Sequence, residues 1–243
     1  MRATYLLVAA TMAIAPTTAL ADYVVVAATQ APAAYAPGTE IATDESLSLP
    51  EGARLTLIER SGRMTNLDGA FDGPVPLADN SRTGDTDADW SMLKRLIGSP
   101  EASSTVLGAA RTGASDIPPP PGVWDVSADS SGPRCVRAGE LILWRRNADT
   151  ATSVTLRSAA GRHDGIAWPV GEHRLAVPDE MARENGRLVV SLGSELRDFD
   201  LSVLPDNLGD APAGLILAWL AEKDCRRQAL ALVGRVHAGA SLD

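Results

Sequence analysis

The sequence predicts a mainly β protein: a small N-terminal β module, a helical and proline-rich connector, and a C-terminal β-sandwich that ends in a short helical tail. Two observations predict the strands. Short apolar runs alternate with polar residues at a period of two, and glycine and proline fall between these runs. A third observation predicts the helices of the mature chain, because apolar residues occur at helical spacing within 87–98 and 208–237.

Residues 1–21 have the pattern of a secretory signal peptide. Arg2 gives a positive start, an apolar run extends to about Ala15, Pro16 interrupts it, and Ala19 and Ala21 are the small residues of a cleavage site. The run is shorter than the roughly 20 residues that a membrane-spanning helix needs. We therefore expect cleavage after Ala21, a periplasmic or secreted mature chain, and no integral membrane segment after cleavage.

The composition of the mature chain argues against one class of partner. Removal of residues 1–21 takes away one basic residue, so that 21 basic residues face 31 acidic ones. Binding of nucleic acid depends on clustered positive charge, and no nucleic-acid partner is expected. Aromatic residues form only 4% of the chain, which suits short strands better than an aromatic-lined sugar cleft.

Residues 22–78 are predicted to form a β module of about five strands. The run DYVVVAA opens it, and Leu47 and Leu49, like Leu55 and Leu57, alternate with polar neighbours as in half-buried strands. Turns are expected at residues 50–52 and 61–62, where proline and glycine occur.

The same segment resembles the FecR-type domain of bacterial envelope proteins. The resemblance lies in PGTEI and in LSLPEGARLTLIERSGRMTNLDGAFDGPV, and it depends on Gly38, Gly52, Ala53, Leu55, Leu57, Gly62, Leu67 and Gly69. The founding members of that family are membrane-spanning regulators of a sigma factor. This chain shows neither their membrane span nor their cytoplasmic segment, so the resemblance implies only an envelope β module that contacts other proteins or the cell wall and has no catalytic residues.

Residues 79–122 are expected to connect two domains. A helix is predicted over about 87–98, and the prolines of 118–121 favour a stiff polyproline spacer over a ligand for a proline-recognition domain. Asp85, Asp87 and Asp89 alternate as in a calcium loop, but the glycine and glutamate of such a loop are missing, and no metal site is predicted.

Residues 123–207 are predicted to form a β-sandwich of six or seven short strands, of roughly immunoglobulin size. ELILWRRNADTATSVTLRS is expected to be a hairpin that turns at residues 147–150, and GIAWPVGEHRLAVP another that turns at Gly171. GRLVVSL and RDFDLSVLP supply two further strands, and Phe199, Leu201 and Val203 alternate in the second.

Residues 208–243 form the helical segment of the prediction. Asp210 is expected to cap the first helix, whose apolar stripe is Leu215, Ile216, Trp219 and Leu220. A second helix is expected to begin near Asp224, with Ala229, Leu232 and Val233 facing inward, and His237 is placed in a solvent-facing tail.

Cys225, in LAEKDCRRQALALVGR, has three possible roles: a nucleophile, a metal ligand or half of a disulfide. A zinc site needs three or four ligands, usually at short spacing, and the only other cysteine, Cys135, lies ninety positions away. Export and an even number of cysteines favour a disulfide between Cys135 and Cys225. The bond is expected to attach the helical segment to the sandwich.

No catalytic, cofactor-binding or metal-binding residue is predicted. His163 is next to Asp164 in an expected turn, but no serine motif of the Gly-x-Ser-x-Gly kind is present, and His173 is placed in another turn. Trp144, Trp168 and Trp219 are interpreted as core residues, which leaves Trp124 as the fourth aromatic of interest.

The function predicted from the sequence is that of an exported, non-catalytic periplasmic protein that contacts another envelope protein or a cell-wall component. The alternatives are a periplasmic hydrolase of unrecognised type, with a site between the two β units, and a carbohydrate- or peptidoglycan-binding module.

Overall fold

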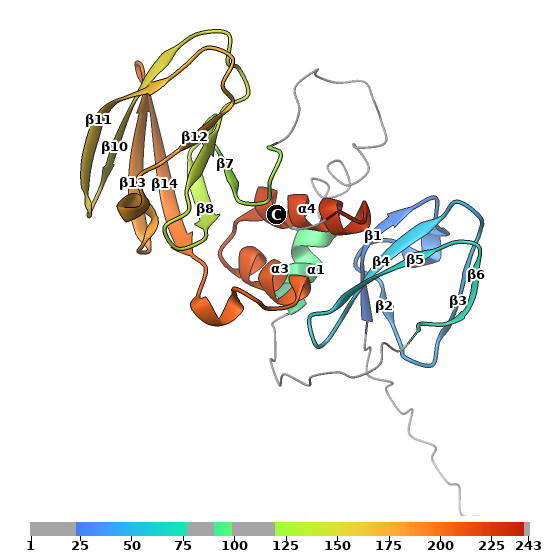
Figure 1. Cartoon of the computed structure of the whole chain (residues 1–243). Helices are drawn as coiled ribbons and strands as arrows, with labels where there is room; N and C mark the ends of the chain where they lie inside the picture. The colour runs from blue at the N-terminus through green and yellow to red at the C-terminus, as the bar shows by residue number, and fades with distance from the viewer. Residues whose placement is uncertain (1–22, 77–89, 99–119, 241–243) are drawn as a thin grey trace, which may run out of the picture.

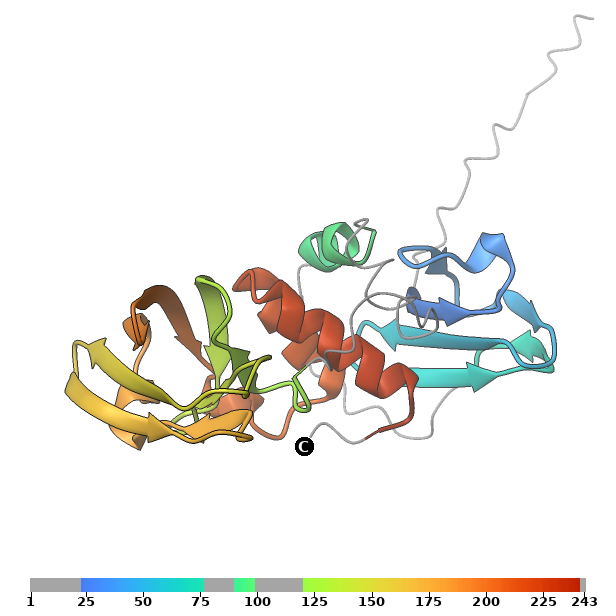
Figure 2. The ribbon, with the colours of Figure 1, turned by 90° about the horizontal axis from the view of Figure 1, so that it is seen from above.

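Two β units lie on either side of a layer of helices (Figures 1 and 2). The computed structural model describes residues 23–76, 90–98 and 120–240. The first β unit comprises residues 23–76, and the second β unit comprises residues 123–204. The signal peptide predicted over 1–21, the acidic trio at 85, 87 and 89, and the first two prolines of the run 118–121 lie outside the described residues.

The first β unit contains six strands: β1 (Tyr23–Thr29), β2 (Glu40–Ile41), β3 (Ser46–Leu49), β4 (Arg54–Glu59), β5 (Met64–Asp68) and β6 (Phe71–Pro74). They form one sheet in the order β2-β1-β4-β5 and a smaller sheet of β3 and β6. A 3₁₀ turn, η1 (Ala33–Tyr35), follows β1.

The alternation predicted for β3 is confirmed, and the one predicted for β4 is incomplete. Leu47 and Leu49 are buried between exposed serines. In β4, Thr56 and Ile58 are buried as well as Leu55 and Leu57, because the second face of this strand lies against the helices. A pattern read along one strand does not show what covers its polar face.

The second β unit contains eight strands: β7 (Asp125–Ser127), β8 (Gly132–Val136), β9 (Ile142–Trp144), β10 (Thr152–Ser158), β11 (Gly161–Trp168), β12 (Arg174–Ala176), β13 (Gly186–Leu192) and β14 (Glu195–Val203). One sheet has the order β11-β10-β13-β14-β8 and the other the order β12-β9-β7. Side chains of both sheets share one core, with Val126 and Leu143 from one and Leu156 and Phe199 from the other. The predicted sandwich is therefore confirmed, but it has eight strands where six or seven were expected.

The two hairpins predicted inside the sandwich are wrong. Strand β9 pairs with β12 and β7, whereas β10 pairs with β11 and β13, so the segment between β9 and β10 crosses from one sheet to the other. The segment between β11 and β12 crosses in the same way. Arg145 holds both crossings together, since its guanidinium donates hydrogen bonds to the main-chain oxygens of Thr150, Pro169 and Glu172.

The helical layer consists of α1 (Trp90–Ile97), α3 (Ala213–Glu222) and α4 (Arg226–His237). Two further 3₁₀ turns, η2 (Asp179–Ala182) and η3 (Asp206–Leu208), lie outside this layer. The predicted inward residues Ala229, Leu232 and Val233 are buried. The predicted cap is wrong, because α3 begins at Ala213 after Pro212, and Asp210 lies in the preceding turn.

The helices join the two β units through one apolar cluster. Val24 and Ile58 enter it from the first β unit, and Val123 and Leu204 enter it from the second. Most of α3 is buried, as expected for a helix that is apolar on more than one side. We call α1, α3 and α4 with this cluster the helical junction. None of the helices in the described part of the chain has the length and apolar character needed to cross a lipid bilayer.

Candidate functional site

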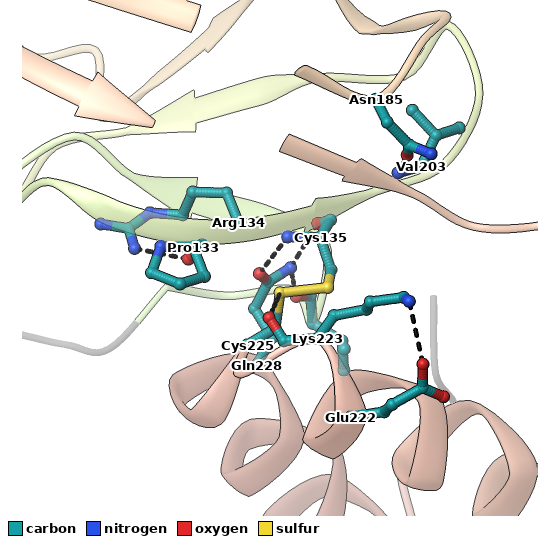
Figure 3. Close-up of a disulfide and its surroundings, with 10 residues drawn as sticks. Pro133, Arg134, Cys135, Asn185, Val203, Glu222, Lys223, Cys225 and Gln228 are labelled. Atoms are coloured by element: carbon teal, nitrogen blue, oxygen red, sulfur yellow. Dashed lines mark hydrogen bonds and ion pairs between the residues drawn. A yellow bond between two sulfur atoms is a disulfide. The ribbon is translucent and has the colours of Figure 1, made fainter. Parts of the chain in front are cut away.

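Cys135 and Cys225 form the predicted disulfide, with their Cα atoms 6.0 Å apart (Figure 3). Cys135 is in β8, an edge strand of the larger sheet, and Cys225 immediately precedes α4. Asp224 adopts φ 56° between α3 and α4, which turns the chain so that Cys225 faces the sandwich. Both sulfur atoms are in the bond, so neither is a thiolate nucleophile or a metal ligand.

The Gln228 side chain binds the same strand beside the disulfide, as Figure 3 shows. Its Oε1 accepts a hydrogen bond from the Cys135 N–H at 2.9 Å, and its Nε2 donates to the Cys135 oxygen at 2.6 Å and to the Val123 oxygen at 3.0 Å. Gln228 is buried, and its amide forms the hydrogen bonds that a neighbouring strand would form if β8 were not at the edge of the sheet. It thus satisfies main-chain groups that are shielded from water.

Two arginines of α4 bind residues in the second β unit and just before it. Arg227 donates to Ser130 Oγ at 2.9 Å, and Arg235 donates to the Pro121 oxygen at 2.6 Å. Close to Arg227, Arg134 lies 4.9 Å from the centre of the Phe199 ring. Burial, with a smaller contribution from the charge of Arg227, lowers the pKa of Arg134 to about 10, so the guanidinium remains charged at neutral pH.

The other end of α4 binds the first β unit through His237, which corrects the prediction that this residue faces solvent. His237 Nε2 lies 2.8 Å from Thr29 Oγ1 in β1, and Nδ1 lies 2.7 Å from Thr56 Oγ1 in β4. Thr56 donates to Asn66 Oδ1 at 2.7 Å, and Asn66 Nδ2 donates to the Val236 oxygen. We call Thr29, Thr56, Asn66 and His237 the His237 network.

The proton positions in this network follow from its partners. Asn66 uses its NH₂ group on a carbonyl, so its Oδ1 must accept the Thr56 proton. Thr56 then accepts from His237, which places the ring proton of the neutral imidazole on Nδ1 and leaves Nε2 to accept the proton of Thr29. Every polar group in the chain of contacts therefore has a partner when the ring is neutral.

A close approach of two glycines brings the first β unit against α3. The N–H of Gly214 donates to the Gly62 oxygen at 2.8 Å. A Cβ at Gly214 would lie 2.3 Å from that oxygen and 2.4 Å from Ile58 Cδ1, so only glycine fits here. An ion pair between Lys94 of α1 and Glu40 of β2 also joins the helices to this unit.

The other two histidines lie apart from the junction. His163 is in strand β11, not in a turn, and its Nε2 is 2.9 Å from Glu180, while Asp164 pairs with Arg162. His173 is exposed, stacks on Trp144 and donates from Nδ1 to the Arg145 oxygen. The three histidines therefore do not form one site.

The tryptophan predictions are confirmed, because Trp144, Trp168 and Trp219 are all buried. Trp124 is half-buried, with the Arg137 guanidinium 5.1 Å from its ring centre. Across residues 23–76, 90–98 and 120–240, no three His, Cys, Asp or Glu side chains come together as a metal site would require.

The contacts that α4 makes with both β units were not evident from its sequence. Cys225, Ala229, Val233 and His237 recur at intervals of four, so one face of the helix contains the disulfide at its start and the imidazole at its end. Gln228 is four positions before Leu232 and lies on the same buried side. The spacing therefore placed these polar residues on an apolar face, but it did not show which strands they would meet.

Comparisons with known proteins gave no relative: no protein-family model matches the chain, and neither the curated proteins nor the solved structures contain a match. The arrangement must be interpreted from its own geometry. Helix α4 attaches to the second β unit at one end and to the first β unit at the other, and the helical junction thereby sets the relative position of two β surfaces. We regard this junction as the candidate functional element.

Proposed function

We propose that the chain is an exported, non-catalytic envelope protein that holds two β surfaces in a fixed arrangement for contact with another envelope protein or a cell-wall component. The observation that carries the proposal is the attachment of α4 at both ends: Cys225 and Gln228 bind β8, and His237 binds β1 and β4. A fixed spacing of two surfaces lowers the entropy cost of binding a partner with both.

Three sequence and structural features support this proposal. The disulfide is of the kind that persists in oxidising compartments, which agrees with the signal peptide predicted over 1–21. The resemblance of residues 22–78 to the FecR-type domain favours a contact module. Strand β14 leaves the sandwich toward the helices. The opposite end of the sandwich carries Val170 and Leu196, the two large apolar side chains that are exposed among the described residues.

Site-specific photo-crosslinking in cells tests the proposal. A photoreactive residue is placed at Asp72 in the first β unit or at Leu196 in the second, since both side chains are exposed. We expect both positions to crosslink to the same envelope component. In the Cys135→Ser/Cys225→Ser variant, the yield from both positions should fall. Different components at the two positions, or yields that do not depend on the disulfide, would contradict the proposal.

One observation favours the hydrolase alternative. Thr29 donates a hydrogen bond to the imidazole of His237, and Thr56 orients that ring. In a hydrolase, a nucleophile, its base and an orienting residue follow one another in the same order. A fluorophosphonate probe distinguishes the two functions: labelling at Thr29 that disappears in His237→Gln would establish a hydrolase, whereas an unlabelled Thr29 is expected if the contact is structural.

A further inference from the structure

In the His237 network, a half-buried histidine joins α4 to the first β unit. His237 ends α4, and its ring nitrogens meet hydroxyl groups of β1 and β4, which are more than 180 positions away in the sequence. The main-chain oxygens of Val236 and His237 also accept hydrogen bonds from the first β unit, through Asn66 and Arg54. The end of α4 thus attaches to that unit by several polar contacts at once.

Protonation of the ring changes one of these contacts directly. The second proton is added at Nε2, the atom that accepts the Thr29 proton when the ring is neutral. The Thr29 hydroxyl must then turn its own proton away and accept from the ring. Thr29 ends its strand, so this rearrangement occurs at the margin of the contact between α4 and β1.

The charges around the ring disfavour the protonated form. Arg54 of β4 faces the ring and donates to the His237 oxygen at 2.9 Å, which puts a second cation beside an imidazolium. Asp68 of β5 is the nearest carboxylate, but it pairs with Arg54 at 2.5 Å. Thr29, Thr56 and Asn66, from β1, β4 and β5, are uncharged. The last carbonyls of α4 favour a cation, and Arg54 already supplies one.

The direction of the pKa shift agrees with this geometry. Burial, and next the charge of Arg54, lower the pKa of His237 below its ordinary value, while Asp68 acts in the opposite direction. The folded state therefore binds the proton less well than the unfolded chain does. The contribution to stability is complete above the ordinary histidine pKa of about 6.5 and is lost as the pH falls through that value toward the lower pKa of the folded state.

We propose that His237 is an acid-sensitive contact that stabilises the attachment of the first β unit to α4 when its ring is neutral and weakens that attachment when the ring is protonated. The disulfide keeps the start of α4 on the second β unit throughout, because Cys135 and Cys225 do not titrate. Acidification therefore loosens one end of the helical junction and leaves the other in place. This inference is independent of the function proposed above.

Amide hydrogen exchange of the full chain at pH 7.5 and pH 5.5, corrected for the intrinsic effect of pH, locates the change. We expect β1, β4 and β5 to lose protection at pH 5.5, while β8, β13 and β14 keep theirs. In His237→Gln, protection of the first β unit should be the same at both pH values. Equal loss in both β units of the wild type, or no loss in either, would overturn the proposal.

A second pair of variants tests the role of charge even if His237→Gln fails to fold. Arg54→Gln removes the cation beside the ring and frees Asp68, so the His237 pKa measured by NMR should rise relative to the wild type, and the loss of protection at pH 5.5 should diminish. Arg187→Gln is the matched control, since the exposed side chain of Arg187 in β13 pairs with that of Asp198 in β14, in the second β unit. An unchanged His237 pKa in Arg54→Gln, or an equal rise in Arg187→Gln, would refute the mechanism.

Discussion

Single polar side chains decide how the apolar helices of this protein join its sheets. Gln228 is the clearest case, because one amide binds both main-chain groups of Cys135 and the oxygen of Val123. Apolar packing has no preferred direction, whereas these hydrogen bonds fix where α4 lies along β8. A residue that is unremarkable in the sequence thus determines the position of a helix.

Replacement of Gln228 by leucine should lower the free energy of unfolding by roughly 2–4 kcal/mol, because buried main-chain groups of Cys135 and Val123 lose their partners. Urea denaturation measures the change. Arg227→Ala serves as the control, since it removes one exposed hydrogen bond and should cost about 0.5 kcal/mol or less. Similar losses in the two variants would show that the amide of Gln228 does not stabilise the junction.

At the scale of elements, α3 and the β4–β5 turn approach each other closely because a glycine lies on each side of the contact. Gly62 adopts φ 82°, and its oxygen receives the N–H of Gly214 at the start of α3. Gly234 in α4 is different, since a Cβ there would meet nothing within 4 Å. The two helical glycines therefore offer a matched comparison of a packed and an open position.

Gly214→Ala should destabilise the protein by about 1–3 kcal/mol, because the new Cβ forces α3 away from Ile58 and Gly62. Gly234→Ala should be neutral or stabilising by up to about 1 kcal/mol, since alanine is the better helix former. Thermal or urea unfolding of both variants checks the pair. A stabilising Gly214→Ala would mean that α3 does not pack closely on this turn.

At the scale of the whole molecule, the disulfide closes a loop that contains nearly all of the second β unit. Cys135 and Cys225 are separated by 90 positions, and between them lie the strands from β9 to β14 and helix α3. The bond therefore fixes the end of this segment to an early strand of the same unit, and it holds the start of α4 where the first β unit can meet the end of that helix.

Loss of the disulfide in Cys135→Ala/Cys225→Ala should reduce the free energy of unfolding by up to about 4–5 kcal/mol, the value that loop-closure entropy gives for a loop of this length. Urea denaturation measures it, and thiol labelling of the denatured, unreduced wild type provides the control, which should show no free thiol. Labelling at both cysteines would contradict the bond itself.

The sequence by itself determined the fold class, the existence and type of most elements, and the pairing of the two cysteines. Alternation in β3 and β14 and the spacing of Ala229, Leu232 and Val233 are local consequences of strand and helix geometry, and they were predicted correctly. An even number of cysteines in a chain predicted to be exported sufficed for the disulfide.

Only the tertiary structure decided which strands pair and what the helices are for. Alternation shows which side chains face inward but not which strand lies alongside, so β9 and β10 were joined in a hairpin that does not exist. The contacts of Gln228 and His237 cross about 90 to 210 positions of sequence, and no local pattern encodes partners so far away. The helices were expected to be a connector and a tail. They form a shared core instead, because their apolar residues pack against apolar residues of both β units.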